Sequence, residues 1–242
     1  MTDKKRIYAL GFFDGVHMGH QALLEQCRNL AGQLNCQTAA ITFDAHPKSL
    51  FSENFPTLIT TCHDRQQLLR RYGIEHIHCF PVSKEVMSTS WEAFLLHLVE
   101  NGAVGFVCGD DFHFGYRGEG NAAKLQEFCS ARQLPCIIVP EQTLNGQRIS
   151  STLIRSLIEA GDLEAATAFL GHAHLLSGTV VPGQQLGRKL GVPTANLLIP
   201  HGIVTPKLGV YACRAIVDGK WYAAVANVGT RPTVDGIGIT VE

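Results

Sequence analysis

Two histidines three residues apart have the clearest catalytic potential in this chain. His17 and His20 end the segment GFFDGVHMGH, residues 11–20, which follows a short apolar run. Gly15 and Gly19 let the backbone approach a ligand closely, and a helix that starts here presents free N–H groups and the positive end of its dipole. Two imidazoles at such a turn can donate hydrogen bonds to phosphoryl oxygens as charge develops. The segment therefore indicates nucleotidyl transfer, with a simple helix cap as the alternative.

A second anion-binding segment, RISSTLIR, occupies residues 148–155 and opens a later predicted helix. The hydroxyls of Ser151 and Thr152, together with Arg155, suit an anion at a helix N-terminus. A triphosphate has to be held from two sides, so this segment complements the histidines. A plain Ser/Thr cap with a solvated arginine is the alternative.

Two further segments follow predicted strands directly. Residues 109–118, GDDFHFGYRG, offer aromatic rings that could stack on a planar ligand and carboxylates that could accept hydrogen bonds. Residues 42–47, TFDAHP, end another strand and are expected to line the same cleft. Each segment could instead be an ordinary polar loop.

A glycine-rich and basic segment lies nearer the C-terminus, at residues 183–196. A glycine loop with Arg188 and Lys189, which also contains Gly187, could wrap a nucleotide phosphate. Thr194 and Asn196 stand at i and i+2, which places their oxygens on one side of a strand. Such hard oxygen ligands suit Mg²⁺, although a basic surface loop is the alternative.

The elements that must position these residues alternate between strand and helix over about the first 170 residues. This alternation predicts an α/β fold with a doubly wound parallel sheet and ligands at the carboxyl ends of the strands. Thr89 and Glu92 match a capping box before one helix. The expected strands are residues 7–12, 38–43, 76–80, 104–108 and 136–139, and the expected helices are 20–30, 64–72, 91–100, 122–132, 151–160 and 163–170.

After Gly171 the pattern changes to that of a small antiparallel β domain. Asp218-Gly219 predicts a tight hairpin between two of its strands. The expected strands are residues 175–181, 209–217, 220–228 and 237–241. We therefore expect two domains, residues 1–172 and 173–242.

Composition excludes several classes of protein. The net charge of -1 lacks the basic excess that nucleic-acid binding normally requires. The sequence has no run of about 18 apolar residues and no signal-peptide pattern, so we expect a cytoplasmic protein without a membrane span. The eight cysteines form no C-x-x-C pair and are expected to be buried, reduced thiols without zinc.

These motifs together resemble the prokaryotic bifunctional riboflavin kinase/FMN adenylyltransferase family. GFFDGVHMGH, GDDFHFGYRGEG and RISSTLIR are similar to its adenylyltransferase motifs, and GRKLGVPTAN, GVYA and NVGTRPT to its flavokinase motifs. The resemblance implies transfer of AMP from ATP to FMN by the first domain and phosphorylation of riboflavin by the second, both with Mg²⁺. Ala45 stands where family members usually have proline, a small departure.

The resemblance also implies a role for each matched residue. His17 and His20 would hold the ATP phosphates and stabilise the transition state, and Asp111 and Phe112 would lie near FMN. Thr194 and Asn196 would position Mg²⁺ and ATP, and Glu242 would be the base that takes the riboflavin hydroxyl proton. The nucleotide site would be shaped by Gly11, Phe12, Phe13, Asp14 and Gly19, and the triphosphate would also be bound by Ser151, Thr152 and Arg155.

The family's kinase domain continues past this glutamate, whereas the sequence stops at Glu242. We therefore expect a truncated kinase domain with open sheet edges, nothing to orient the Glu242 carboxylate, and little or no FMN formation. Two other functions remain open: a related nucleotidyltransferase with another acceptor, such as pantetheine phosphate, and a non-catalytic module that binds flavin or nucleotide. The expected partners are small molecules, and the sequence leaves the oligomeric state open.

Overall fold

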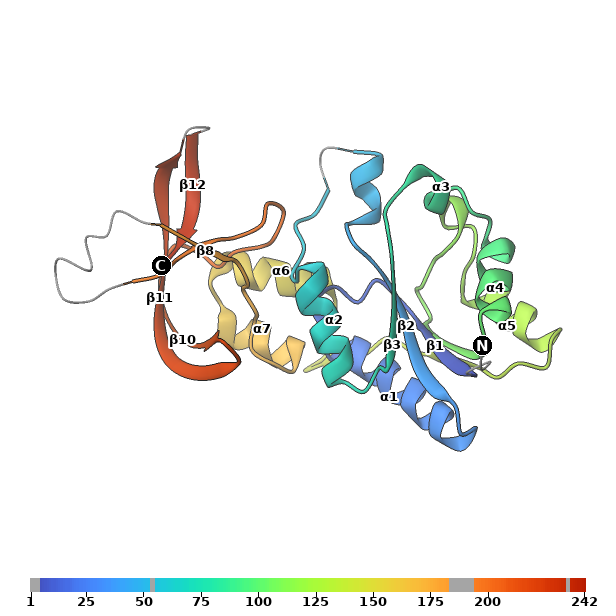
Figure 1. Cartoon of the computed structure of the whole chain (residues 1–242). Coiled ribbons are helices and arrows are strands. Elements are labelled where there is room, and N and C mark those ends of the chain that lie inside the picture. Colours follow the sequence, from blue (N-terminus) through green and yellow to red (C-terminus); the bar gives the residue numbers. More distant parts are fainter. Residues whose placement is uncertain (1–4, 53–54, 183–193, 234–235) are drawn as a thin grey trace.

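The computed structural model describes residues 5–52, 55–182, 194–233 and 236–242. Figure 1 shows an α/β part with the N-terminus and a β part with the C-terminus. No helix of the described residues has the length and apolar character needed to cross a membrane.

The α/β part is built on a five-stranded parallel sheet with the strand order β3-β2-β1-β4-β5. The strand order reverses direction between β1 and β4, so the sheet is doubly wound. The loops after these two strands diverge, and in open α/β sheets ligands commonly bind in the crevice at such a point. The prediction of an α/β fold is confirmed. The strands are β1 (Arg6–Leu10), β2 (Gln37–Phe43), β3 (His76–Phe80), β4 (Ala103–Gly109) and β5 (Cys136–Val139).

The helices fall close to the predicted ranges because apolar spacing and caps define them. Ser90, rather than Thr89, caps α4 and accepts a hydrogen bond from Ala93 N, so the predicted capping box is wrong by one residue. The helices are α1 (Met18–Gln33), α2 (Cys62–Arg71), α3 (Lys84–Met87), α4 (Trp91–Glu100), α5 (Ala122–Ser130), α6 (Ser151–Ala160) and α7 (Leu163–Leu170), with 3-10 turns η1 (Asp14–Val16), η2 (Pro47–Leu50) and η3 (Tyr116–Gly118).

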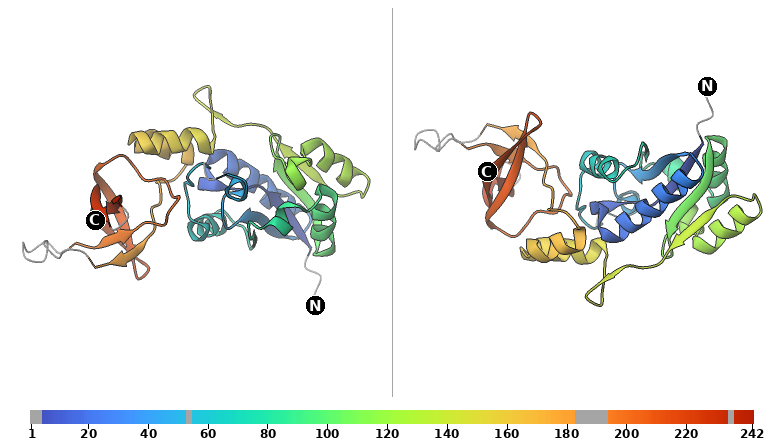
Figure 2. Two further views of the ribbon diagram at one scale, coloured as in Figure 1. Left: turned by 90° about the horizontal axis from the view of Figure 1, so that it is seen from above. Right: turned by 90° about the horizontal axis from the view of Figure 1, so that it is seen from below.

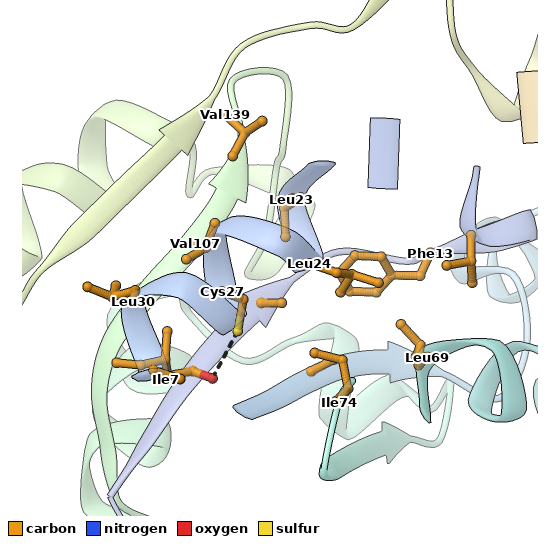
Figure 3. Packing of buried hydrophobic residues seen from close by; sticks show 14 of the residues in the cluster. Ile7, Phe13, Leu23, Leu24, Cys27, Leu30, Leu69, Ile74, Val107 and Val139 are labelled. Atoms are coloured by element: carbon orange, nitrogen blue, oxygen red, sulfur yellow. Dashed lines mark hydrogen bonds between the residues drawn. The ribbon is translucent and has the colours of Figure 1, made fainter. Parts of the chain in front are cut away.

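Side chains of β1 alternate between two hydrophobic cores, one on each face of the sheet. Ile7 and Ala9 face the core with α1 and α2, whereas Tyr8 and Leu10 face the core with α4 and α5. Figure 3 shows the first core, where the Cys27 thiol donates to Ile7 O at 3.4 Å. Because β1 is buried on both faces, the turn that follows it has a rigid support.

The β part is a five-stranded sheet with the order β10-β11-β12-β9-β8. Asp218 and Gly219, with φ of 49° and 75°, form the predicted hairpin turn between β10 and β11. The predicted strand over residues 175–181 is correct only at its end. The three-residue β9 lies outside the strand ranges predicted for this part, although it begins at Asn196, which its spacing from Thr194 had placed on a strand. The strands are β8 (Thr179–Val181), β9 (Asn196–Leu198), β10 (Gly209–Val217), β11 (Lys220–Thr233) and β12 (Gly236–Val241), and a small hairpin pairs β6 (Thr143–Leu144) with β7 (Gln147–Arg148).

The two parts touch through the loop before α2 and through the helices α6 and α7. Both views of Figure 2 show these two helices beside the β part. Leu58 N donates to Gly202 O at 2.7 Å, and Val204 N donates to Leu58 O at 2.8 Å. Val204 also joins a third core with Ile59 and the two helices. The loop that carries Leu58 and Ile59 is therefore held from both parts.

Candidate active sites

The turn after β1 is the most tightly constrained loop of the α/β part. Phe13 and Val16 have φ of 59° and 43°, in the left-handed region that non-glycine residues rarely adopt. Phe13 is fully buried beneath the turn. Thr42 Oγ1 donates to Phe12 O at 2.8 Å, which ties the turn to the end of β2. Backbone strain of this kind persists only where surrounding contacts enforce it, and it is frequent at functional sites.

Asp14 anchors this turn from below. Its carboxylate accepts hydrogen bonds from Ile59 N at 2.9 Å, from Thr60 N at 3.1 Å and from Thr60 Oγ1 at 3.2 Å. Arg155 forms an ion pair with it at 3.4 Å and donates from Nε to Thr57 O. Only 2% of Asp14 is exposed, so its carboxylate oxygens accept hydrogen bonds from the protein itself.

His17 and His20 form a stacked pair where α1 begins. Their ring centroids are 3.6 Å apart and the ring planes differ by 12°. His17 Nδ1 accepts from His20 N at 3.3 Å as the cap of α1, so the His17 proton resides on Nε2. His20 Nδ1 is buried and has no hydrogen-bond partner among the described residues. The helix cap is thus present, and because it uses only the Nδ1 of His17, it leaves the other ring nitrogens of the pair available for a ligand.

Both imidazoles are neutral at pH 7. Burial lowers the pKa of His17 to about 4, and burial together with the neighbouring His17 and Arg65 lowers the pKa of His20 well below its usual value. A neutral imidazole donates one hydrogen bond without carrying a fixed charge. Such groups would become stronger donors only when a phosphate brings negative charge to the pair.

A cavity of about 240 Å³, the first cavity, opens above the histidines. It lies at the carboxyl ends of β1, β4 and β5, as the reversal of strand order predicts. Its wall brings together many of the predicted residues, namely Gly11, Phe12, Phe13, His17, Gly19, His20, Asp111, Phe112 and Ser151.

Arg148 is the cation in the wall of the first cavity. Its guanidinium pairs with Asp111 and, at 2.8 Å, with Glu141, and these side chains are about half exposed. An exposed pair of this kind contributes little to stability, so the arginine can exchange partners when an anion enters.

Three predicted nucleotide residues do not line the first cavity. Asp14 and Arg155 pair with each other behind the turn, and Thr152 is exposed on α6. Ser151, in contrast, lines the cavity and donates from Oγ to Asp14 O at 3.0 Å. Ser151, Thr152 and Arg155 share one helix start, but the helix turns their side chains in different directions.

A second cavity, of about 550 Å³ and mostly apolar, adjoins the first and shares Phe12 and Phe112 with it. Phe112 and Phe114 stack with centroids 5.6 Å apart. Phe43 and Pro47, from the segment expected to share a cleft with residues 109–118, line this cavity together with Phe112 and Phe114. Sequence reasoning missed the contributors from β3, α3 and α4, namely Phe80, Val86, Met87, Ala93, Phe94 and His97. The available signal was the aromatic residue that ends β3.

A third group of predicted residues meets in the β part. Thr194 Oγ1 and, at 3.3 Å, Asn196 Nδ2 donate to Glu242 Oε1. The Glu242 backbone exchanges hydrogen bonds of 2.8 and 3.0 Å with Asn227. The expectation that nothing orients the Glu242 carboxylate is therefore wrong, because two side chains and one residue of β11 hold it. The strand before it, β12, pairs on one side with β11 and on the other with β9.

The same group contains oxygen atoms of the kind that bind Mg²⁺. Asn196 Oδ1 is buried and has no hydrogen-bond partner among the described residues. It lies in the side chain whose Nδ2 contacts Glu242, beside the Thr194 hydroxyl. An orphaned acceptor next to a carboxylate and a hydroxyl fits a hard cation. Gly187 and Arg188, predicted to bind the nucleotide here, lie outside the described residues.

Comparison with known proteins matches both parts. A family model described as FAD synthetase matches residues 1–153, and one described as riboflavin kinase matches residues 170–242. The bifunctional riboflavin kinase/FMN adenylyltransferase of Listeria monocytogenes is 36% identical over 235 residues, which cover 96% of this chain and 74% of the relative. The Escherichia coli K12 protein of the same name is 35% identical over 237 residues, covering 96% and 75%.

A solved structure agrees over the whole chain. The crystal structure titled macrolide-efflux protein from Streptococcus pneumoniae superposes with a TM-score of 0.87 and 30% sequence identity, covering 100% of this chain and 79% of that one. Sequence similarity and both domain models lead to one family. The chain belongs to the bifunctional riboflavin kinase/FMN adenylyltransferases.

Proposed function

We propose that the α/β part transfers AMP from ATP to FMN, giving FAD and pyrophosphate, with ATP phosphates in the first cavity and the flavin ring in the second. One observation carries the proposal: the two cavities meet at Phe12 and Phe112, with His17 and His20 in the wall of the first. Two substrates bound in adjoining cavities react as if within one molecule, which removes much of the entropic barrier.

The histidine pair supplies hydrogen bonds to the ATP phosphates. His17 Nε2–H and the free N–H groups at the start of α1 are donors that do not need to be reorganised during the reaction. As charge develops on the α-phosphate, these donors strengthen and His20 stabilises the same oxygens. Arg148 leaves Asp111 and Glu141 to neutralise the pyrophosphate that departs, while Ser151 adds its hydroxyl at the same wall.

Asp14 and Arg155 act on the reaction by positioning the turn. Their ion pair, with the donors Ile59 and Thr60, fixes the backbone between Phe12 and the helix start. A displacement of about 1 Å in such a support can cost a hundredfold in rate. We therefore assign both residues to support of the nucleotide site rather than to contact with ATP.

The second cavity suits a flat aromatic ligand. Phe112 and Phe114 provide stacking surfaces, and the remaining wall is largely apolar. Asp111, beside Phe112, stands in the wall of the first cavity, where it would face the ribityl and phosphate end of FMN.

The β part is proposed to phosphorylate the 5′-hydroxyl of riboflavin. This replaces the sequence-based expectation of little or no FMN formation, because Thr194, Asn196 and Asn227 hold Glu242 in place. Glu242, held by Thr194 and Asn196, is the base that accepts the hydroxyl proton. Thr194 and Asn196 would hold Mg²⁺, which would neutralise the ATP phosphates when bound. We also propose that the two activities divide at residues 172 and 173, that the protein is cytoplasmic, and that it binds small molecules rather than nucleic acid.

The test is an assay of the purified chain with ATP, FMN and Mg²⁺, in which FAD and pyrophosphate are quantified together. Equal amounts of both products are expected. A folded chain that adenylylates pantetheine phosphate but not FMN would indicate another acceptor. A chain that binds FMN and ATP without releasing pyrophosphate would be a non-catalytic module, and either result overturns the proposal.

A further inference from the structure

Two cysteine thiols lie in contact beside the turn after β1, and neither lines the cavities described above. Cys62 is the first residue of α2 and Cys79 lies in β3, and their Sγ atoms are 3.1 Å apart. Both residues are half-buried, whereas the sequence predicts buried cysteines. A disulfide has an S–S distance of about 2.05 Å, so closure by about 1 Å would join the two sulfurs.

The two thiols differ in their surroundings. Cys62 Sγ accepts a hydrogen bond from Gln66 Nε2 at 3.3 Å and stands at a helix N-terminus, where the dipole stabilises an anion. Burial, together with the contact to Cys62, raises the pKa of the Cys79 thiol to about 12, so Cys79 keeps its proton and can donate it toward Cys62. This arrangement favours Cys62 as the sulfur that attacks first and Cys79 as the thiol that resolves.

Each cysteine is one contact away from the strained turn. Cys62 follows Thr61 and Thr60, and Thr60 donates to Asp14 and accepts from Gly15 N at 3.1 Å. Cys79 is the register partner of Thr42, whose hydroxyl donates to Phe12 O. The Cys62–Cys79 contact therefore joins the two supports that hold the turn from opposite sides.

Arg65 lies between these supports and reinforces the connection. It is fully buried, its guanidinium stacks 4.4 Å from the Phe12 ring, and it donates to Phe43 O at 2.7 Å. Arg65 follows Cys62 by one turn of α2, so movement of the helix start is transmitted to Phe12. The shared wall of the two cavities is thus coupled to the position of Cys62.

We propose that Cys62 and Cys79 form a redox modification site, in which exchange with a low-molecular-weight disulfide joins them reversibly and slows adenylyl transfer. The Cys62 thiolate attacks one sulfur of the small disulfide and releases its other half as a thiolate. Cys79, on losing its proton, then attacks Cys62 Sγ and releases the second half. Two electrons pass from the cysteines to the small disulfide, which becomes two thiols, and a dithiol reverses the exchange.

The experiment treats the full chain with glutathione disulfide, blocks remaining thiols, and analyses proteolytic peptides by mass spectrometry. We expect a peptide pair linked through Cys62 and Cys79, lighter by two hydrogen atoms than the two free peptides. We also expect FAD formation to fall at least threefold and to recover with dithiothreitol. The rate of FAD formation rests on the proposed function, whereas detection of the linked peptide does not. Failure of the redox proposal can therefore be distinguished from failure of the proposed function.

Matched variants separate this site from the other cysteines. Cys62→Ser and Cys79→Ser should each give no linked peptide and no inhibition by glutathione disulfide. Each should keep the rate of FAD formation that the wild type has before oxidation. Cys213→Ser, which removes an exposed thiol on β10, should keep both the linked peptide and the inhibition. The proposal is overturned if oxidised wild-type protein lacks the linked peptide, or if the disulfide-linked protein makes FAD as fast as the dithiol form does. It is also overturned if glutathione disulfide inhibits Cys62→Ser as strongly as it inhibits the wild type.

Discussion

The turn after β1 and the Glu242 group both lie at the ends of inner strands, but different amounts of the fold hold them. Asp14 and His17 are 2% and 7% exposed and rest on a parallel sheet with a core on each face. Glu242 follows β12 and Thr194 precedes β9 in an antiparallel sheet whose strand residues Val210 and Val225 are about 70% exposed. The first site is fixed by contacts from distant segments, whereas the second is fixed by pairing within one sheet.

The largest expected effect comes from removing the buried anchor of the first site. Asp14→Ala leaves Arg155 without its counter-charge and the donors of Ile59 and Thr60 without an acceptor. We expect the free energy of unfolding in urea to fall by about 3–5 kcal/mol. Asp44→Ala, which removes an exposed carboxylate that accepts from Val82 N, should cost less than about 1 kcal/mol. Equal losses would show that the first site is no better anchored than the surface.

His20→Ala tests the chemistry of the first site and leaves its anchor, Asp14, in place. Removal of one preorganised donor should lower the kcat of FAD formation about a hundredfold, equivalent to about 2.7 kcal/mol. The far-UV spectrum and thermal midpoint should stay close to wild type. A variant that keeps wild-type turnover would remove His20 from the mechanism.

Glu242→Gln is the corresponding change in the second site. Gln keeps an oxygen that can accept from Thr194 and Asn196 but cannot take a proton, so riboflavin phosphorylation should fall at least tenfold. FAD formation from FMN should stay within twofold, because Glu242 lines neither cavity. Parallel loss of both activities would contradict the assignment of separate sites.

Acid should weaken the first site through His17. Its pKa is about 4 in the folded protein, against an ordinary value of about 6.5, so the unfolded chain binds more protons and stability falls as pH drops through this range. Between pH 7 and pH 5 this contributes about 2 kcal/mol of lost unfolding free energy. His17→Gln should remove that part of the pH dependence, whereas replacement of the exposed His201 should not. Identical slopes in wild type and His17→Gln would contradict burial as the cause.

The smallest expected effect lies in the hairpin of the β part. Gly219 has a φ of 75° and open space where a Cβ would stand, so Gly219→Ala should cost about 1 kcal/mol through the backbone alone. Gly32→Ala, at an equally open position in α1, should be neutral or stabilising. Urea unfolding of the two variants measures the difference, and a neutral Gly219→Ala would show that the turn is not held in this conformation.

The parallel sheet was predictable because apolar runs and caps recur along the α/β part. Three-residue β9 gave no periodic signal, and its place beside β12 depends on tertiary pairing. The motifs assign Asp14 and Arg155 to nucleotide binding, whereas in the structure the two side chains pair with each other. A motif gives the spacing of residues along the chain but not the direction of their side chains. The second cavity draws on β3, α3 and α4 together, an assembly that no local pattern contains. The sequence thus predicted which residues gather at the turn after β1 better than it predicted where their side chains point.

The most direct test measures FMN binding and FAD formation in one variant, His17→Gln/His20→Gln. Because the flavin is assigned to the second cavity and the histidines to the first, this variant should bind FMN with a Kd within threefold of wild type, measured by quenching of flavin fluorescence. Its rate of FAD and pyrophosphate formation should fall at least a hundredfold. FAD formation at the wild-type rate, or loss of FMN binding in a folded variant, would contradict the division of labour between the two cavities.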